Sequence, residues 1–209
     1  MSDKKYGMLV DLATCIGCNS CVVACKMEND VPISKFNTWI ESWDVDNDGR
    51  VSRANLPKLC NHCENPACVH VCPTGASYVA DDGTVQIDDG RCIGCKYCMA
   101  ACPYGVRYVV EETGDVHKCT LCEHRISNGL LPACTASCVT GARVFGDLND
   151  PASDISKRMK DAGKTSVLLE DKGLGPVVHY IGLDEIEGMT RVSNVQKGGN
   201  VIERYEGRQ

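Results

Sequence analysis

The pattern of apolar and polar residues predicts short strands at several places along this chain. Residues 6 to 10 read as a strand that leads into a loop, and residues 85 to 88 repeat that arrangement later in the chain. An Asp-Asp-Gly sequence at 81 to 83 predicts a hairpin turn just before the second of these strands. The recurrence of strand and loop indicates an internal repeat.

A segment between the two repeats predicts a hairpin insertion. Residues 39 to 43 and 51 to 56 are strand formers that flank an acidic turn at 44 to 49. This turn half matches a calcium-binding loop, but its twelfth position holds Asn55 where such a loop has a bidentate glutamate. Because strand formers also stand where the helices of a calcium loop belong, we favour a polar hairpin turn. The two tryptophans beside it are expected to be packing groups.

The last third of the chain predicts one helix and one strand pair. Asp150-Pro151 offers an N-cap followed by proline at the first helical position, which predicts a helix to about residue 161. Residues 165 to 169 and 177 to 181 read as paired strands. Residues 184 to 209 are polar, contain several glycines and show no clear periodicity. We therefore expect this polar tail to be disordered or to lie across another subunit.

The spacing of the cysteines predicts that the chain binds metal clusters. The third of four cysteine groups reads C-x2-C-x2-C-x3-C-P, with its thiols at Cys92, Cys95, Cys98 and Cys102. Thiols at every third residue can wrap three corners of a cubane cluster, and Gly94 allows the tight turn that this needs. In two-cluster ferredoxins the fourth cysteine binds the other cluster. One such motif therefore predicts a partner motif.

Three further groups use all of the remaining cysteines. The second group has two extra residues in its middle gap, and the fourth has a long insertion. The first and fourth groups lack the proline that follows the last cysteine of the other two. In chain order these three groups are Cys15, Cys18, Cys21 and Cys25; Cys60, Cys63, Cys68 and Cys72; and Cys119, Cys122, Cys134 and Cys138. The sixteen thiols match the ligands of four [4Fe-4S] clusters.

Two other uses of sixteen cysteines remain open. A disulfide scaffold fits poorly, because the sequence begins without an apolar signal region. Zinc is the stronger rival, but tetrahedral zinc sites usually pair two C-x2-4-C knuckles and do not need a third and fourth cysteine at these spacings. Acid-labile sulfide would separate clusters from zinc.

Composition and charge narrow the fold class and the partners. Aromatic residues make up 5% of the chain, so we expect clusters to occupy interior positions and folding to depend on their insertion. The formal net charge of -6 falls to about -14 with four clusters of about -2 each, which argues against nucleic acid as a partner. No apolar run approaches the roughly 18 residues of a membrane span, so another subunit must provide any attachment to a membrane.

The predicted fold is α+β, with tandem bacterial-ferredoxin-like domains, pseudo-twofold repeats and a cluster-filled core. Each domain combines two cysteine motifs.

Residues around the motifs resemble a known family. Cys-Lys-Met-Glu-Asn at 25 to 29, Cys-Asn-His-Cys-Glu-Asn-Pro-Ala-Cys at 60 to 68 and Cys-Pro-Thr-Gly-Ala at 72 to 76 are similar to the four-cluster electron-transfer subunit of molybdopterin oxidoreductases in the dimethyl sulfoxide reductase superfamily. The polysulfide and thiosulfate reductase type is most similar, with respiratory arsenate reductase subunits next. Nitrate reductase subunits tend to carry a tryptophan at the position of Cys95, which is intact here.

The resemblance implies how the motifs exchange ligands. The first motif shares its clusters with the fourth, and the second shares its clusters with the third. With this pairing, the expected divisions are residues 1–25 plus 105–150 for one ferredoxin-like domain, 26–59 for the hairpin insertion, 60–104 for the other ferredoxin-like domain, 151–183 for the helix and strand pair, and 184–209 for the polar tail. The implied ligand sets are Cys15, Cys18, Cys21 and Cys138; Cys119, Cys122, Cys134 and Cys25; Cys60, Cys63, Cys68 and Cys102; and Cys92, Cys95, Cys98 and Cys72.

The same resemblance implies the partners. The first motif's cluster is expected to face a molybdopterin catalytic subunit, and the third motif's cluster a quinone-reactive membrane subunit. We expect membrane association through these partners on the outer face, after export with the catalytic subunit, with a cytoplasmic location as the alternative.

A freestanding polyferredoxin and a zinc-binding interaction module are the alternative functions. No catalytic constellation of side chains is recognisable in the sequence, and Lys26, His70, Lys96 and Lys118 are candidates for tuning cluster potentials.

Overall fold

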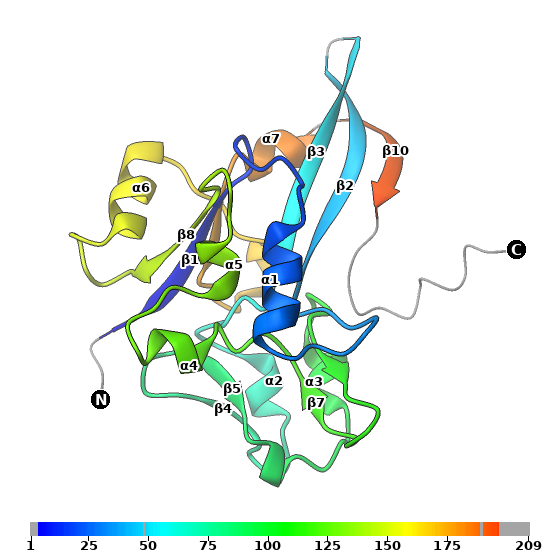
Figure 1. Ribbon diagram of the computed structural model, residues 1–209, viewed down its shortest axis with the longest axis vertical. Helices are drawn as coiled ribbons and strands as arrows, with labels where there is room; N and C mark the ends of the chain where they lie inside the picture. The colour runs from blue at the N-terminus through cyan, green and yellow to red at the C-terminus, as the bar shows by residue number, and fades with distance from the viewer. Residues whose placement is uncertain (1–3, 48, 189, 197–209) are drawn as a thin grey trace, which may run out of the picture.

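A computed structural model describes residues 4–47, 49–188 and 190–196. The fold is α+β and combines short helices with four small sheets. Figure 1 shows a long hairpin at one end of the molecule and the helices and small hairpins of the second and third cysteine motifs at the other end. The helix that carries the last two cysteines of the first motif, α1 (Ser20–Glu28), lies between these two regions.

The first sheet is built on the predicted N-terminal strand. β1 (Tyr6–Asp11) pairs antiparallel with β8 (Arg143–Asp147) and parallel with β9 (Val178–Ile181). The central residues of β1 are buried because strands pair with both of its edges. α6 (Asp154–Ala162) packs beside β8. This sheet joins the start of the chain to the segment after the last cysteine motif.

The hairpin predicted between residues 39 and 56 is present. β2 (Thr38–Asn47) and β3 (Arg50–Leu59) pair antiparallel along their whole lengths. The turn is shorter than the predicted range of 44 to 49, because β2 continues to residue 47. Asp44 therefore lies in the strand, opposite Arg53. Those two side chains form an ion pair with a nitrogen to oxygen distance of 3.0 Å. Both tryptophans of β2 are buried, as predicted.

Four helices occupy matching positions in the four cysteine motifs. Each begins one residue before the third cysteine of its motif, so that this thiol always lies in the first turn. The helices are α1 (Ser20–Glu28), α2 (Ala67–His70), α3 (Tyr97–Ala101) and α5 (Ala133–Ala136). α1 packs against α5, and α2 packs against α3. The helices therefore pair the first motif with the fourth and the second with the third.

Small hairpins and turns complete the region around the second and third motifs. The predicted turn at 81 to 83 joins β4 (Ser77–Val79) to β5 (Val85–Ile87), and η1 (Asp89–Arg91) follows. β6 (Tyr108–Val109) pairs with β7 (Val116–His117), ahead of α4 (Glu123–Ile126). These hairpins contain only two strands each, so they cover their cysteine motifs less completely than the larger sheets cover theirs.

Two predictions for residues 151 to 183 were wrong in detail. The helix begins at Asp154 and not at residue 151, because Ser153 is the N-cap and its hydroxyl oxygen accepts the Ser156 N–H at 3.3 Å. Residues 165 to 169 do not form a strand; one bridge joins Ser166 to Tyr180, and η2 (Glu170–Lys172) follows. The second predicted strand, β9, is present but pairs with β1.

The prediction for the polar tail was wrong for its first half. α7 (Leu183–Gly188) carries two buried apolar side chains, Leu183 and Ile186. β10 (Thr190–Gln196) then pairs antiparallel with β2, with two irregularities in its register. The free edge of β2 therefore forms main-chain hydrogen bonds with this polar segment. The periodicity of the sequence did not predict this pairing. The rest of the predicted tail, 197 to 209, lies outside the described residues.

Candidate metal centres

All sixteen cysteines are free thiols, and the fold gathers twelve of them around three cavities. Each cavity is lined by three cysteines of one motif and one cysteine of another. We call these groups set A (Cys15, Cys18, Cys21 and Cys138), set B (Cys119, Cys122, Cys134 and Cys25) and set D (Cys92, Cys95, Cys98 and Cys72). The space free of protein atoms is similar in the three, about 330, 290 and 330 Å³ respectively.

The remaining four thiols also lie together, as set C (Cys60, Cys63, Cys68 and Cys102). Burial raises the pKa of the Cys63 thiol to about 12, and repulsion by the thiolates of the other three members adds to this effect. Cys102 is likewise close to Cys60 and Cys68. Every cysteine singled out from the sequence therefore lies in a group of four that draws on two motifs.

The thiols surround cavities and do not converge on single points. Among the described residues, no three Cys, His, Asp or Glu side chains are close enough to act as ligands of one metal ion. Four thiols spread around a cavity suit an inorganic group with several metal corners, such as a cubane. A tetrahedral zinc ion, by contrast, holds its thiolates at about 2.3 Å from one centre. The donor set and its spacing fit [4Fe-4S] clusters.

Left-handed backbone conformations shape the loops of the first and third motifs in the same way. Gly17 and Gly94, each between the first two cysteines of its motif, have φ angles of 69° and 64°. A Cβ atom at Gly17 would lie 2.6 Å from the Asn55 side chain, and one at Gly94 would lie 2.6 Å from a backbone oxygen. Glycine at these two positions therefore allows the thiols to face inward without a clash.

Hydrogen bonds to sulfur surround several of the thiols. The Ser77 N–H donates to Cys72 Sγ at 3.4 Å, and the Leu121 N–H donates to Cys119 Sγ at 3.3 Å. Asn29, at the end of α1, lies between two thiols of set B: its side-chain nitrogen is 3.6 Å from Cys25 Sγ and 3.7 Å from Cys122 Sγ. Such contacts raise the potential of a bound cluster because they stabilise added negative charge.

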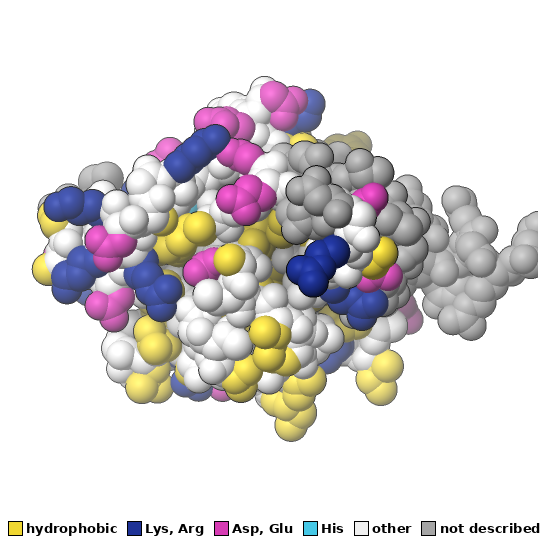
Figure 2. Space-filling view, turned by 90° about the horizontal axis from the view of Figure 1, so that it is seen from above, with side chains coloured by type: hydrophobic (Ala, Val, Ile, Leu, Met, Phe, Trp, Pro, Cys, Tyr) yellow, Lys and Arg dark blue, Asp and Glu magenta, His cyan; other side chains and the backbone are white. Residues whose placement is uncertain are grey.

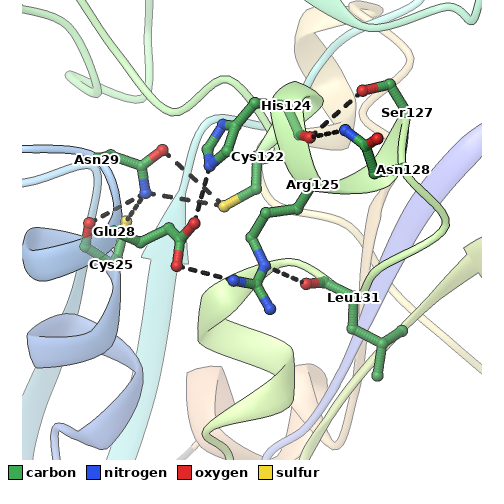
Figure 3. Close-up of polar contacts among 9 residues, drawn as sticks. All are labelled: Cys25, Glu28, Asn29, Cys122, His124, Arg125, Ser127, Asn128 and Leu131. Atoms are coloured by element: carbon green, nitrogen blue, oxygen red, sulfur yellow. Dashed lines mark hydrogen bonds and ion pairs between the residues drawn. The ribbon is translucent and has the colours of Figure 1, made fainter.

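Polar contacts also tie α1 to α4 beside set B (Figure 3). The Glu28 carboxylate accepts a hydrogen bond from Arg125 Nη1 at 2.8 Å, and its other oxygen is 2.9 Å from His124 Nε2. Arg125 Nε in turn donates to the Leu131 carbonyl at 2.8 Å. Residues almost a hundred positions apart in the sequence are thereby held together where the first motif meets the fourth.

The four candidate tuning residues lie in different surroundings. His70 and Lys96 are exposed. Lys26 donates to the carbonyl of Pro32 at 3.0 Å and to that of Lys35, and its ammonium lies 4.4 Å from the centre of the Phe36 ring. Lys118 alone of the four is buried beside thiols.

Two buried arginines beside the thiols were missed by sequence reasoning. Arg107 lines the cavity of set D, and Arg143 lines the cavity of set A. A signal was present in the sequence, because each stands five residues after the last cysteine of its motif, at Cys102 and Cys138.

The surface carries charges of both signs. Figure 2 looks onto the end of the molecule that carries the long hairpin, and acidic and basic side chains are intermingled on this face among the described residues. No helix in the described part of the chain is both long and apolar enough to cross a membrane.

Comparison with known proteins agrees with this site. Two family models described as "4Fe-4S dicluster domain" match residues 14–76 and 51–148. These matches define the chain as an iron-sulfur protein with tandem ferredoxin-type 4Fe-4S domains.

Curated relatives place it more narrowly. The B subunit of tetrathionate reductase from Salmonella typhimurium is 48% identical over 87% of this chain and 74% of the relative. The B chain of polysulfide reductase from Wolinella succinogenes is 45% identical over 74% and 82%, and the thiosulfate reductase electron transfer subunit of Salmonella typhi is 46% identical over 70% and 78%. This protein belongs to the same family of iron-sulfur electron-transfer subunits of multi-subunit reductases, and the predicted resemblance is confirmed.

Proposed function

We propose that this chain holds four [4Fe-4S] clusters, one in each thiol set, and conducts single electrons between two partner subunits. The observation that carries the proposal is that each of three cavities is lined by four thiols drawn from two motifs. When bound, a cluster supplies a one-electron redox centre. The chain supplies the thiolates, the hydrogen bonds to sulfur and the burial that together set its potential.

The clusters form two pairs related by a pseudo-twofold repeat. The packing of α1 on α5 and of α2 on α3 supports this arrangement, since each helix carries the third thiol of its motif. The corresponding domain division is residues 1–25 plus 105–150 for sets A and B, and residues 60–104 for sets C and D. Clusters in these positions fill much of the interior that a low aromatic content leaves.

The four sets follow one another in a row. Cys21 of set A is close to Cys134 of set B, Cys119 of set B is close to Cys60 of set C, and Cys68 of set C is close to Cys98 of set D. An electron entering at one end would therefore pass through A, B, C and D, or in the reverse order. The contact between Cys119 and Cys60 is the step that connects the two halves.

Both ends of this row reach the surface. Cys18 of set A and Cys95 of set D are the exposed thiols of their sets. Apolar side chains beside them are also exposed, with Ile16 at 64% and Ile93 at 66% of their full accessible surface. Exposed apolar groups beside a terminal redox centre suit docking of a partner at each end.

The partners follow from family membership. We propose that set A faces a molybdopterin catalytic subunit that acts on a sulfur or arsenic compound, and that set D faces a quinone-reactive membrane subunit. The relatives are named as components of reductases, one of them as an electron transfer subunit, which supports a place in a larger complex. We propose that the chain is held at the outer face of the membrane through these partners.

Metal analysis of the native complex tests the function. After anaerobic purification we expect about sixteen iron and sixteen sulfide per chain, because each cubane contains four of each, together with a copurifying molybdenum protein. A freestanding polyferredoxin would contain the same iron without a partner. Fewer than about ten iron with stoichiometric zinc would contradict the proposal.

A further inference from the structure

Among the described residues, three cations are buried in the interior of the protein, one at each step between neighbouring thiol sets. Arg107, Lys118 and Arg143 are each 3% exposed. The guanidinium group of arginine does not lose its proton in proteins, so two of these positive charges are permanent. A buried charge is costly unless another charge compensates for it.

Arg107 lies between sets C and D. Its Nη2 atom donates to Cys68 Sγ of set C and to the Ser77 hydroxyl, both at 2.9 Å. The same side chain lines the cavity of set D and interacts with Cys98 of that set. It therefore touches both members of one pair.

Arg143 lies in the same way between sets A and B. Its Nη2 atom donates to the Thr38 hydroxyl at 2.8 Å. The side chain lines the cavity of set A and interacts with Cys21 of set A and with Cys134 of set B.

The two arginines occupy the same place in the internal repeat. Each stands five residues after the fourth cysteine of its motif, in the segments Cys-Pro-Tyr-Gly-Val-Arg at 102 to 107 and Cys-Val-Thr-Gly-Ala-Arg at 138 to 143. The second motif has Ser77 at the matching position, and its hydroxyl is the group that accepts from Arg107. The repeat thus places one arginine in each pair, while the hydroxyl partner of Arg143 is Thr38 of β2 and not a residue of the repeat.

Lys118 lies at the step that connects the two pairs. Its ammonium donates to the carbonyl of Cys119, in set B, at 2.7 Å and to the carbonyl of Val85. Its charge also acts on Cys60 of set C.

Carboxylates do not compensate for these three charges in the described part of the chain. The ion pairs among the described residues involve other cations and lie at or near the surface. Among the described residues, the groups that act as anions on the three cations are cysteine thiolates, and the Tyr180 phenol is a further neighbour of Arg143. A thiolate-bound cubane carries about -2 when oxidised and about -3 after it accepts an electron, so the charge nearby grows when an electron arrives.

We infer that Arg143, Lys118 and Arg107 are built-in counter-charges of the electron path, each of which stabilises the reduced forms of the two clusters that flank it. In each transfer the donor cluster loses one electron and becomes oxidised, while its neighbour gains that electron and becomes reduced. The cation between them exchanges neither an electron nor a proton. Because it attracts the added electron on either side, it raises both reduction potentials. This inference rests on the proposed function.

The test is a redox titration of the purified complex, monitored by electron paramagnetic resonance, in variants that remove one charge at a time. Arg107→Gln is expected to lower the potentials of clusters C and D, Arg143→Gln those of A and B, and Lys118→Met those of B and C. We expect at least a tenfold fall in the ratio of reduced to oxidised cluster at a fixed potential, which for one electron is about 59 mV. Clusters that do not touch the altered residue should keep their potentials.

Matched variants separate charge from packing. Arg107→Lys and Arg143→Lys keep the positive charge and should shift the potentials in the same direction but by less than the glutamine variants do. Unchanged potentials in a glutamine variant that retains about sixteen iron would overturn the inference while leaving the proposed function intact. A wild-type complex without four reducible clusters would instead overturn the proposed function.

A measurement on the unaltered protein decides the matter if the glutamine variants do not retain iron. Protein grown with ¹⁵N-labelled arginine should show magnetic coupling between the label and the reduced clusters, because Arg107 donates directly to Cys68 Sγ. Coupling of this kind at clusters of both pairs supports the inference. Its absence from all four clusters contradicts it.

Discussion

The two halves of the molecule place the same kind of cysteine motif in different surroundings. In the half that holds sets A and B, five of the eight thiols are buried, namely Cys21, Cys25, Cys119, Cys122 and Cys134. In the half that holds sets C and D, two of eight are buried, Cys60 and Cys98. Burial and solvent access influence the potential of an iron-sulfur cluster, so similar spacing does not imply equal redox behaviour.

The difference comes from the elements that cover each half. Strands β1 and β2 bring buried apolar side chains such as Met8, Ile40 and Trp43 against the first half. Two-stranded hairpins lie over the second half. The cysteine spacing therefore specifies the loop that presents the thiols. Segments far away in the sequence determine how much solvent reaches those thiols.

Truncating a buried tryptophan of β2 should destabilise the protein more than the other changes described below. Trp43 is 2% exposed, and Trp43→Ala should destabilise the protein by about 3–5 kcal/mol, through lost burial and the cavity left behind. The measurement is loss of cluster absorbance against urea concentration. Tyr97→Ala is the control near set D, because Tyr97 is 63% exposed and its truncation should change stability by less than about 0.5 kcal/mol. Equal effects would show that the two halves are covered alike.

Removing β10 should loosen one half and leave the other unchanged. A chain that ends at residue 188 keeps Ile186 but exposes the edge of β2 that β10 covers. Amide hydrogens of β2 that β10 protects should then exchange at least tenfold faster, while those of β4 and β5 keep their rates. The iron content should remain at about sixteen. Unchanged exchange in β2 would contradict the pairing.

A smaller effect is expected from the hydrogen bonds of Asn29 to sulfur. Asn29→Leu removes donors to Cys25 and Cys122, and each such bond contributes about 1 kcal/mol. The potential of cluster B should fall in a redox titration, while cluster D remains unchanged. Asn128→Ala is the matched control, because Asn128 donates to the backbone of α4 and not to a thiol. If the potential of cluster B fell equally in Asn128→Ala, the change would come from a disturbance of α4 and not from the lost hydrogen bonds to sulfur.

The smallest expected effect is a pH dependence at the contact between α1 and α4. The hydrogen bond from His124, assisted by the charge of Arg125, lowers the pKa of the Glu28 carboxyl from its usual 4.5. A carboxyl with a lowered pKa in the folded state stabilises the protein above its unfolded pKa, and this contribution is lost as the pH falls through the folded value. Glu28→Gln should flatten the stability profile below pH 4.5, as measured by urea unfolding. An unchanged profile would show that Glu28 does not contribute to the pH dependence of stability.

Sequence reasoning recovered the metal chemistry better than the elements that enclose it. Local spacing determines the cysteine loops, so the strands before them and the turn at 81 to 83 could be read directly. The pairing of β10 with β2 could not, because it depends on a free sheet edge more than 130 residues earlier in the chain. Arg107 and Arg143 were missed for a related reason. An arginine in a sequence reads as a surface charge, and only its position in the folded repeat shows that thiolates surround it.

Each cluster is proposed to take its fourth thiolate from a different motif, and spectroscopy of cysteine variants can show which thiolate each cluster uses. A cubane with three thiolates loses its unligated iron and becomes a three-iron cluster with a distinct paramagnetic signal. Cys72→Ala and Cys95→Ala should both produce this species at cluster D, with similar spectra, because both thiols line the same cavity. Cys63→Ala should alter cluster C and give a different spectrum. Matching spectra from Cys72→Ala and Cys63→Ala, with Cys95→Ala unlike both, would contradict the account.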